Sequence, residues 1–106
     1  MAKSRRYEDS LYEALQDPRE AIEYLNAAME DDDPSVFLLA LKDLADAHGG
    51  VTRIAETAHL NRQNLYRALS ENGNPTYESL QAVLHAMGLR LSISPHEEND
   101  QRAACG

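Results

Sequence analysis

The sequence predicts a mainly α-helical protein, and three observations support this fold class. Helix-start signals recur, because an aspartate followed by a proline occurs at both 17–18 and 33–34. Hydrophobic residues then follow at helical spacing. Only residues 89–94 alternate as a strand does. At 106 residues the chain is long enough for one hydrophobic core and too short for two ordinary domains.

The N-terminal half is predicted to hold two well-marked helices. The first spans residues 17–29 and the second spans residues 33–48, and each begins with the aspartate as cap and the proline in the first turn. Gly49 and Gly50 end the second helix. Residues 1–16 are expected to form an arm with at most a short helical turn over 10–16. The main domain is therefore expected to span residues 17–94.

Two short helices are predicted after the glycines. Thr52 is expected to cap a helix that ends at Ala58, and Asn61 to cap a second helix that runs to about Leu69. The turn between them is so short that the two helices cannot lie antiparallel. They are expected to cross steeply, as in a helix-turn-helix over residues 52–70.

A longer helix and one strand complete the predicted elements. Thr76 is expected to cap the helix, and Gly88 to end it. The segment 89–94 reads as a half-buried strand, which needs a partner for its backbone. Pairing with its own copy across a two-fold axis, packing as a lone extended arm, and addition to a partner protein all remain open. The first option makes a homodimer, with dimerisation residues Leu89, Leu91 and Ile93. Residues 95–106 read as a disordered tail.

The second short helix has an outward face suited to DNA. Between residues 62 and 67 this face presents arginine, glutamine and asparagine with no acid, in a chain otherwise rich in acids. Arginine forms bidentate hydrogen bonds to guanine, and glutamine or asparagine to adenine. Arg62 and Gln63 are therefore predicted to contact bases, with Arg67 one turn further on. The residues predicted to contact DNA are Thr52, Asn61, Arg62, Gln63, Asn64, Tyr66, Arg67, Ser70, Asn72 and Asn74.

These contacts are expected to differ in kind. The asparagines at the start of the helix and the polar loop residues suit phosphates, which position a protein on the duplex: Asn61, Asn64, Ser70, Asn72 and Asn74. Tyr66 suits either stacking on the DNA or simply covering its helix. The alternative interpretation of the whole face is an ordinary solvated helix.

Charge is distributed unevenly along the chain. The net charge is −8, which by itself disfavours nucleic acid. Residues 1–50, however, carry 5 basic and 12 acidic residues, net −7, whereas residues 51–94 carry 4 basic and 3 acidic residues, net +1. This asymmetry indicates two different partners, one of them positively charged. The acidic run 30–33 is either a solvated linker or a contact for that basic partner.

The sequence offers no signal for catalysis, a metal or a cofactor. The four histidines are scattered, with the nearest two 11 residues apart, and no motif joins them to a nucleophile or to metal-ligand spacing. The single cysteine, Cys105, cannot close an internal disulfide. No stretch is apolar enough for a membrane span or a signal peptide, so a cytoplasmic location is expected.

Several stretches resemble a known family, the Cro/cI-type (Xre-like) helix-turn-helix antitoxins and in particular the short HigA-like addiction-module antidote proteins. Together they cover roughly residues 15–94. His59 departs from the pattern, since glycine is usual at this turn position. The matching stretches are residues 17–28, 37–45, 60–70, 73–75 and 84–91.

The resemblance implies a lambda-repressor-like five-helix DNA-binding domain. It further implies a homodimer that represses its own operon by binding double-stranded operator DNA. The same protein would neutralise a cognate toxin, commonly a small basic ribonuclease. Two other functions remain open at this point, a stand-alone phage-type repressor and a protein-interaction adaptor that does not bind DNA.

Overall fold

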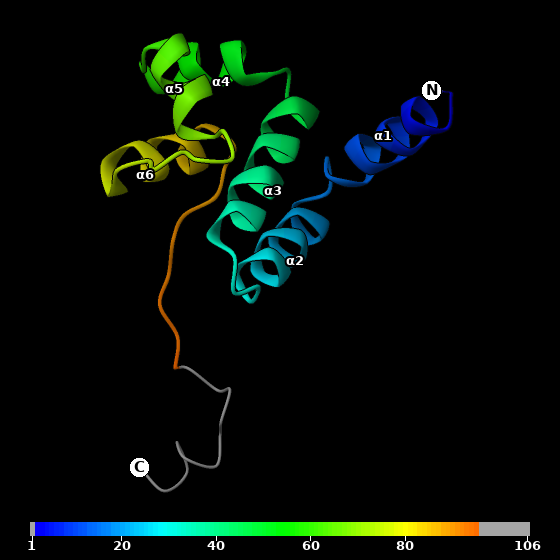
Figure 1. Cartoon of the computed structure of the whole chain (residues 1–106), viewed down its shortest axis with the longest axis horizontal. Helices are drawn as coiled ribbons and strands as arrows, with labels where there is room; N and C mark the ends of the chain where they lie inside the picture. The colour runs from blue at the N-terminus through cyan, green and yellow to red at the C-terminus, as the bar shows by residue number, and fades with distance from the viewer. Residues whose placement is uncertain (1, 96–106) are drawn as a thin grey trace, which may run out of the picture.

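Six helices make up the described part of the chain, residues 2–95 of a computed structural model, with side chains described from Tyr7 onward (Figure 1). The mainly α class is confirmed, with six helices where five were expected. No strand occurs within residues 2–95. The helices are α1 (Ala2–Ala14), α2 (Pro18–Met29), α3 (Pro34–Ala47), α4 (Val51–Ala58), α5 (Arg62–Ala68) and α6 (Tyr77–Ala86).

The extra helix is α1, where the sequence predicted only a short turn. Leu15, just after α1, is buried, and Leu11 packs against the core from the last turns of the helix. Two polar contacts add to this docking on α3: the Tyr12 hydroxyl donates to Asp46 at 3.5 Å, and the Gln16 side-chain amide donates to the Ala47 carbonyl. The prediction missed most of α1 because its sequence is mostly polar and offers few apolar positions, whereas its C-terminal end is held on α3 by these tertiary contacts.

Helices α2 and α3 begin as the sequence predicted. The Asp17 carboxylate accepts from the Arg19 backbone N–H at 3.0 Å, and the Asp33 carboxylate accepts from the Ser35 backbone N–H at 3.0 Å. Each cap satisfies a backbone donor that has no partner within the helix. The two caps therefore fix where the helices start.

Helix α3 lies at the centre of the molecule. It contacts α1 and α2 on one side and α4 on the other, and α4 in turn contacts both α5 and α6 (Figure 1). Leu41 and Leu44 of α3 are completely buried, which places them at the middle of the core. The remaining buried hydrophobic residues are Leu15, Ala21, Leu25, Ala28, Leu38, Ala40, Ala45, Val51, Ile54, Ala55, Leu65, Leu69, Val83 and Leu84.

Three helices end with the same hydrogen-bond pattern, the Schellman motif. A residue just past the helix donates its N–H to the carbonyl five residues back, as Gly50 does to the Ala45 carbonyl at 2.9 Å, and the residue before it adopts a left-handed conformation. Gly49 and Gly88 hold the left-handed position after α3 and α6. After α4 that position is His59, with φ 60° and ψ 43°.

The start of α4 corrects one predicted cap. The helix begins at Val51 with Gly50 as N-cap residue, and no side chain caps it. Thr52 is therefore not the cap, because the Schellman turn of α3 already places Gly50 directly before the first residue of α4. Asn61 and Thr76 do cap α5 and α6, as predicted.

The segment after α6 differs from the predicted strand. Residues 89–94 form an extended arm that is not assigned to a strand: Leu89 and Leu91 pack against the core, and residues 92–94 are exposed where the arm leaves the helices (Figure 1). A strand requires a partner for its backbone, and no backbone hydrogen bond in the described chain involves residues 90–95. The predicted disordered tail lies outside the described residues except for Pro95.

Candidate nucleic-acid interface

Helix α5 is held on α4 by one face and exposes the other. Leu65 and Leu69 are buried at 3% exposure each, and Ala68 is half-buried. The Asn61 side-chain oxygen accepts from the Asn64 backbone N–H at 2.8 Å, which fixes the first turn. Since the buried residues of α5 lie on one side of the helix, its opposite side, which carries the predicted DNA-binding residues, must face solvent.

The five residues predicted on that face are all exposed. Arg62, Gln63, Asn64 and Arg67 are exposed, and Tyr66 is 48% exposed. Among the described side chains, the one ion pair joins Lys42 to Asp46 on α3, at 3.1 Å. The two arginines of α5 are thus available for an anionic partner.

The two asparagines have part of their hydrogen-bonding capacity occupied. The oxygen of Asn61 caps the helix, and the oxygen of Asn64 accepts from the Arg67 guanidinium at 3.4 Å. The side-chain NH₂ group of each remains as a donor. Donors are what phosphate oxygens require, so both residues retain the chemistry predicted for them.

The loop after α5 is packed tightly against the end of that helix. The Ser70 hydroxyl donates to the Arg67 carbonyl at 2.7 Å, and the Gly73 N–H donates to the Ser70 carbonyl at 2.8 Å. A Cβ atom at Gly73 would overlap the backbone carbonyl of Ala68. Glycine at this position therefore lets the loop close, and Ser70, Asn72 and Asn74 are exposed on it.

The tenth predicted residue, Thr52, lies on α4 and not on this face. It is half-buried in the first turn of α4, whereas the other nine lie on α5 or beside its ends. Arg53, which was not among the predicted residues, is a basic side chain exposed on α4. Its exposure could have been predicted from the sequence, because it is a polar residue next to the apolar Ile54 and Ala55, and polar residues beside an apolar stripe face outward.

The acidic half of the chain contains two kinds of carboxylate. Asp43 and Asp46 of α3 are used internally: the Tyr24 hydroxyl donates to Asp43 at 2.8 Å, and Asp46 accepts from Tyr12 and Lys42. Burial and the hydrogen bond to Asp43 raise the pKa of Tyr24.

The acidic run 30–33 is exposed on the turn between α2 and α3. Its last residue, Asp33, accepts hydrogen bonds from the backbone N–H and the hydroxyl of Ser35. These bonds hold the pKa of Asp33 below its usual value. All four carboxylates of this turn therefore face solvent.

Comparison with known proteins places the chain in a family. A family profile described as "Probable addiction module antidote protein" matches residues 6–95. The chain belongs to this family. An uncharacterized protein of Haemophilus influenzae (strain ATCC 51907 / DSM 11121 / KW20 / Rd) is 37% identical over 70 residues, which cover 66% of this chain and 71% of that protein. No solved structure matches the chain.

The antidote family supports the predicted antitoxin class. The match spans both the acidic α1–α3 region and the α4–α5 pair, so it includes every residue predicted to contact DNA. Within the described residues, no helix is sufficiently long and apolar to traverse a bilayer. No group of three or more potential metal-ligating side chains comes together in the same part of the chain.

Proposed function

We propose that this antidote-family protein is a DNA-binding antitoxin, which represses its own operon through α4 and α5 and neutralises a small basic toxin. The observation that carries the DNA-binding part is the outward face of α5. Its arginine, glutamine and asparagine side chains are exposed, and its arginines lack ion pairs among the described residues. The proposal contains no catalytic step.

In this proposal α4 and α5 form a helix-turn-helix, with α5 as the recognition helix. Arg62 and Gln63 lie in its first turn, the part of such a helix that enters the major groove. There Arg62 suits guanine, and Gln63 suits adenine. Arg67 lies one turn further on and continues the same face.

Phosphate contacts would hold this helix in register. Asn61, Asn64, Ser70, Asn72 and Asn74 flank the base-reading residues and retain donors or hydroxyl groups for phosphate oxygens. Thr52 and Arg53 at the start of α4 suit the same role on the neighbouring phosphates. Tyr66 is exposed enough to stack against the sugar-phosphate backbone.

The test is a gel-shift experiment with the DNA upstream of the protein's own reading frame. Replacing Arg62 and Gln63 by alanine should abolish specific binding, because two base-reading side chains are lost while the buried face of α5 is untouched. Arg19→Ala with Glu20→Ala on α2 is the matched control, since both are exposed residues far from α5 in sequence. Unchanged binding by the α5 variant would refute the assignment.

A homodimer is part of the proposal. A single recognition helix covers one half-site, and specific operator binding by such helices requires two half-sites about one DNA turn apart. Leu89, Leu91 and Ile93 on the extended arm remain the proposed dimerisation residues. Deleting residues 89–106 should give monomers in sedimentation, and persistent dimers would contradict the role of the arm.

The toxin is proposed to bind the acidic region. The exposed carboxylates of α2 and of the turn at 30–33 give this region a negative charge that would accelerate association with a basic protein. Co-expression with the product of a neighbouring reading frame that encodes a small basic protein tests the idea directly: the two should co-purify, at lower yield in high salt. If the two proteins do not co-purify but the chain still binds its upstream DNA specifically, the result would favour a stand-alone repressor.

A further inference from the structure

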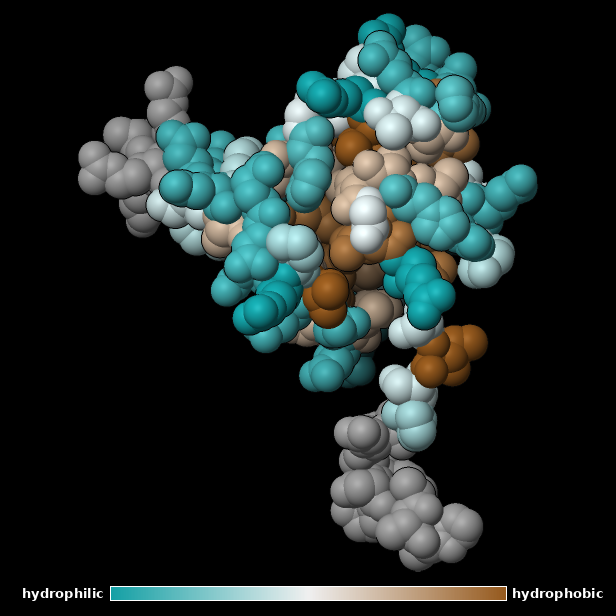
Figure 2. Space-filling model, turned by 180° about the vertical axis from the view of Figure 1, so that it is seen from behind, coloured by the Kyte–Doolittle hydropathy of each residue, from teal (hydrophilic) through white to brown (hydrophobic). Residues whose placement is uncertain are grey.

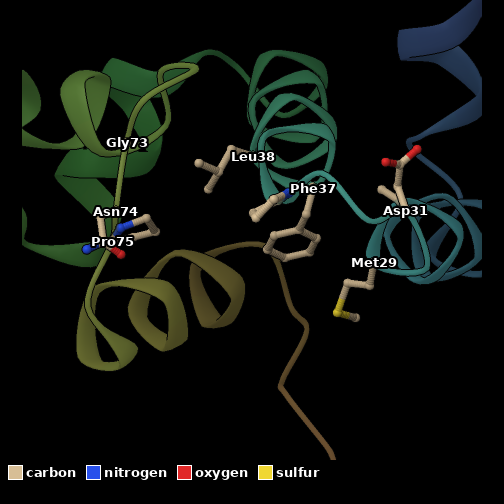
Figure 3. Close-up of a pocket in the computed structure, with 9 residues that line it drawn as sticks. Met29, Asp31, Phe37, Leu38, Gly73, Asn74 and Pro75 are labelled. Carbon is tan, nitrogen blue, oxygen red and sulfur yellow. The ribbon is translucent and has the colours of Figure 1, made fainter. Parts of the chain in front are cut away.

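An open cavity lies between the α2–α3 turn and the loop before α6. Its volume is about 280 Å³, and it is lined mostly by hydrophobic groups. Figure 3 shows the side chains of Phe37 and Met29 extending from α3 and α2 toward the same side, with Pro75 on the opposite loop. Met29 is 51% exposed, so the cavity opens to solvent along its edge. Asp31 supplies a carboxylate at the rim.

The extended arm carries the complementary groups. Leu89 and Leu91 are half-buried against the protein's own core, whereas Ile93 is 99% exposed. Figure 2 shows a hydrophobic side chain on the arm standing away from the body of the molecule. Arg90 is exposed on the same arm, and no acid lies between residues 89 and 95.

We propose that Ile93 of one copy occupies the cavity between Phe37, Met29 and Pro75 of a second copy, in a reciprocal arm exchange. This inference rests on the homodimer proposed above and identifies the surface that receives the arm. The arm and the cavity match in hydrophobicity and in charge. The aliphatic side chain of Ile93 enters an apolar cavity, and Arg90 approaches the carboxylate of Asp31 and its acidic neighbours.

The structure favours a second copy over the protein's own arm as the occupant. Within one chain the arm leaves Ile93 in solvent and the cavity open, so neither hydrophobic surface is covered. Reciprocal exchange across a two-fold axis covers two isoleucines and two cavities at once. The backbone groups of residues 90–95, which make no backbone hydrogen bond within the described chain, also become available to the partner, as in other cases where an extended segment adds to a protein surface.

Cross-linking between separately labelled copies tests the inference. In a Cys105→Ser background, one tagged chain carries Ile93→Cys and another carries Met29→Cys, and the mixture is treated with a short bis-maleimide. A covalent heterodimer is expected. Leu39→Cys is the matched control, because Leu39 is similarly exposed at 59% and lies on the opposite side of α3 from Phe37.

Sedimentation gives an independent measurement. Ile93→Gln should raise the dimer dissociation constant at least tenfold, whereas Ser92→Gln on the same arm should leave it unchanged. Both positions are exposed in the single chain, so neither variant should alter folding. Arg90→Asp should weaken the dimer, and adding Asp31→Arg should restore it.

The outcomes separate this inference from the proposed function. A dimer that cross-links only between the two Ile93→Cys positions, or equally well to Leu39→Cys, overturns the arm exchange and leaves the proposed dimer standing. Cross-linking only when both cysteines occupy one chain shows that the protein's own arm fills the cavity, and also overturns it. If the chain is monomeric at all concentrations, both the exchange and the dimer fail, while gel shifts still decide DNA binding.

Discussion

Replacing His59 by glycine should stabilise the protein. His59 is the one non-glycine residue with positive φ among the described residues, and it occupies the position that Gly49 and Gly88 hold in the two other Schellman motifs. A left-handed conformation costs a residue with a Cβ atom about 1–2 kcal/mol. Glycine removes that cost. Loss of the His59 side chain removes little packing, because His59 is exposed.

The expected gain is smaller than the full strain. Glycine has more conformational freedom in the unfolded chain, which costs about 0.5–1 kcal/mol on folding. The difference is a stabilisation of about 0.5–1 kcal/mol. For a domain of this size, that corresponds to a rise in melting temperature of roughly 2–8 °C.

Thermal unfolding followed by circular dichroism measures the shift. His59→Ala is the control, since alanine retains the Cβ atom and the strain, and it should leave the melting temperature nearly unchanged. His59→Val should lower it, because a β-branched residue tolerates this conformation poorly. A glycine variant no more stable than the alanine variant would show that the turn after α4 is not strained.

Three further changes have expected outcomes. Tyr24→Phe should lower stability by about 1 kcal/mol through the lost hydrogen bond to Asp43. Because the folded-state pKa of Tyr24 is raised, its contribution is complete below pH 10 and declines as pH rises further, so the wild type should lose more stability there than the variant in urea titrations. Asn61→Ala should cost about 1 kcal/mol, measured as chemical denaturation, by uncapping α5. Gly73→Ala should displace the loop and lower the melting temperature, and an unchanged value would contradict the close approach.

The helices were predictable from the sequence wherever local signals determine them. The Asp-Pro pairs begin α2 and α3, and Asn61 caps α5, because a short polar side chain satisfies free backbone donors without any tertiary context. His59 departs from the family pattern, in which glycine is usual at this turn position, and it adopts the left-handed conformation that glycine favours.

Features that depend on tertiary contacts or on a partner were not predictable. The length of α1 follows from its docking on α3 through Tyr12 and Leu15, which local propensity does not encode. The arm at 89–94 alternates as a strand does, yet alternation specifies only which side chains can be buried together and not whether a backbone partner exists. The predicted DNA-binding residues of α5 share one exposed face, while Thr52 lies on α4 and is half-buried.

The most direct test of the DNA-binding proposal is amide chemical-shift mapping of the full chain with its upstream DNA. The largest perturbations should fall on Asn61–Arg67 and on the loop 70–74, with a smaller set at the start of α4. Residues of α1 and α2 should change little. Perturbations confined to α1 and α2, or an absence of specific shifts at saturating DNA, would contradict the assignment of α5 as the recognition helix.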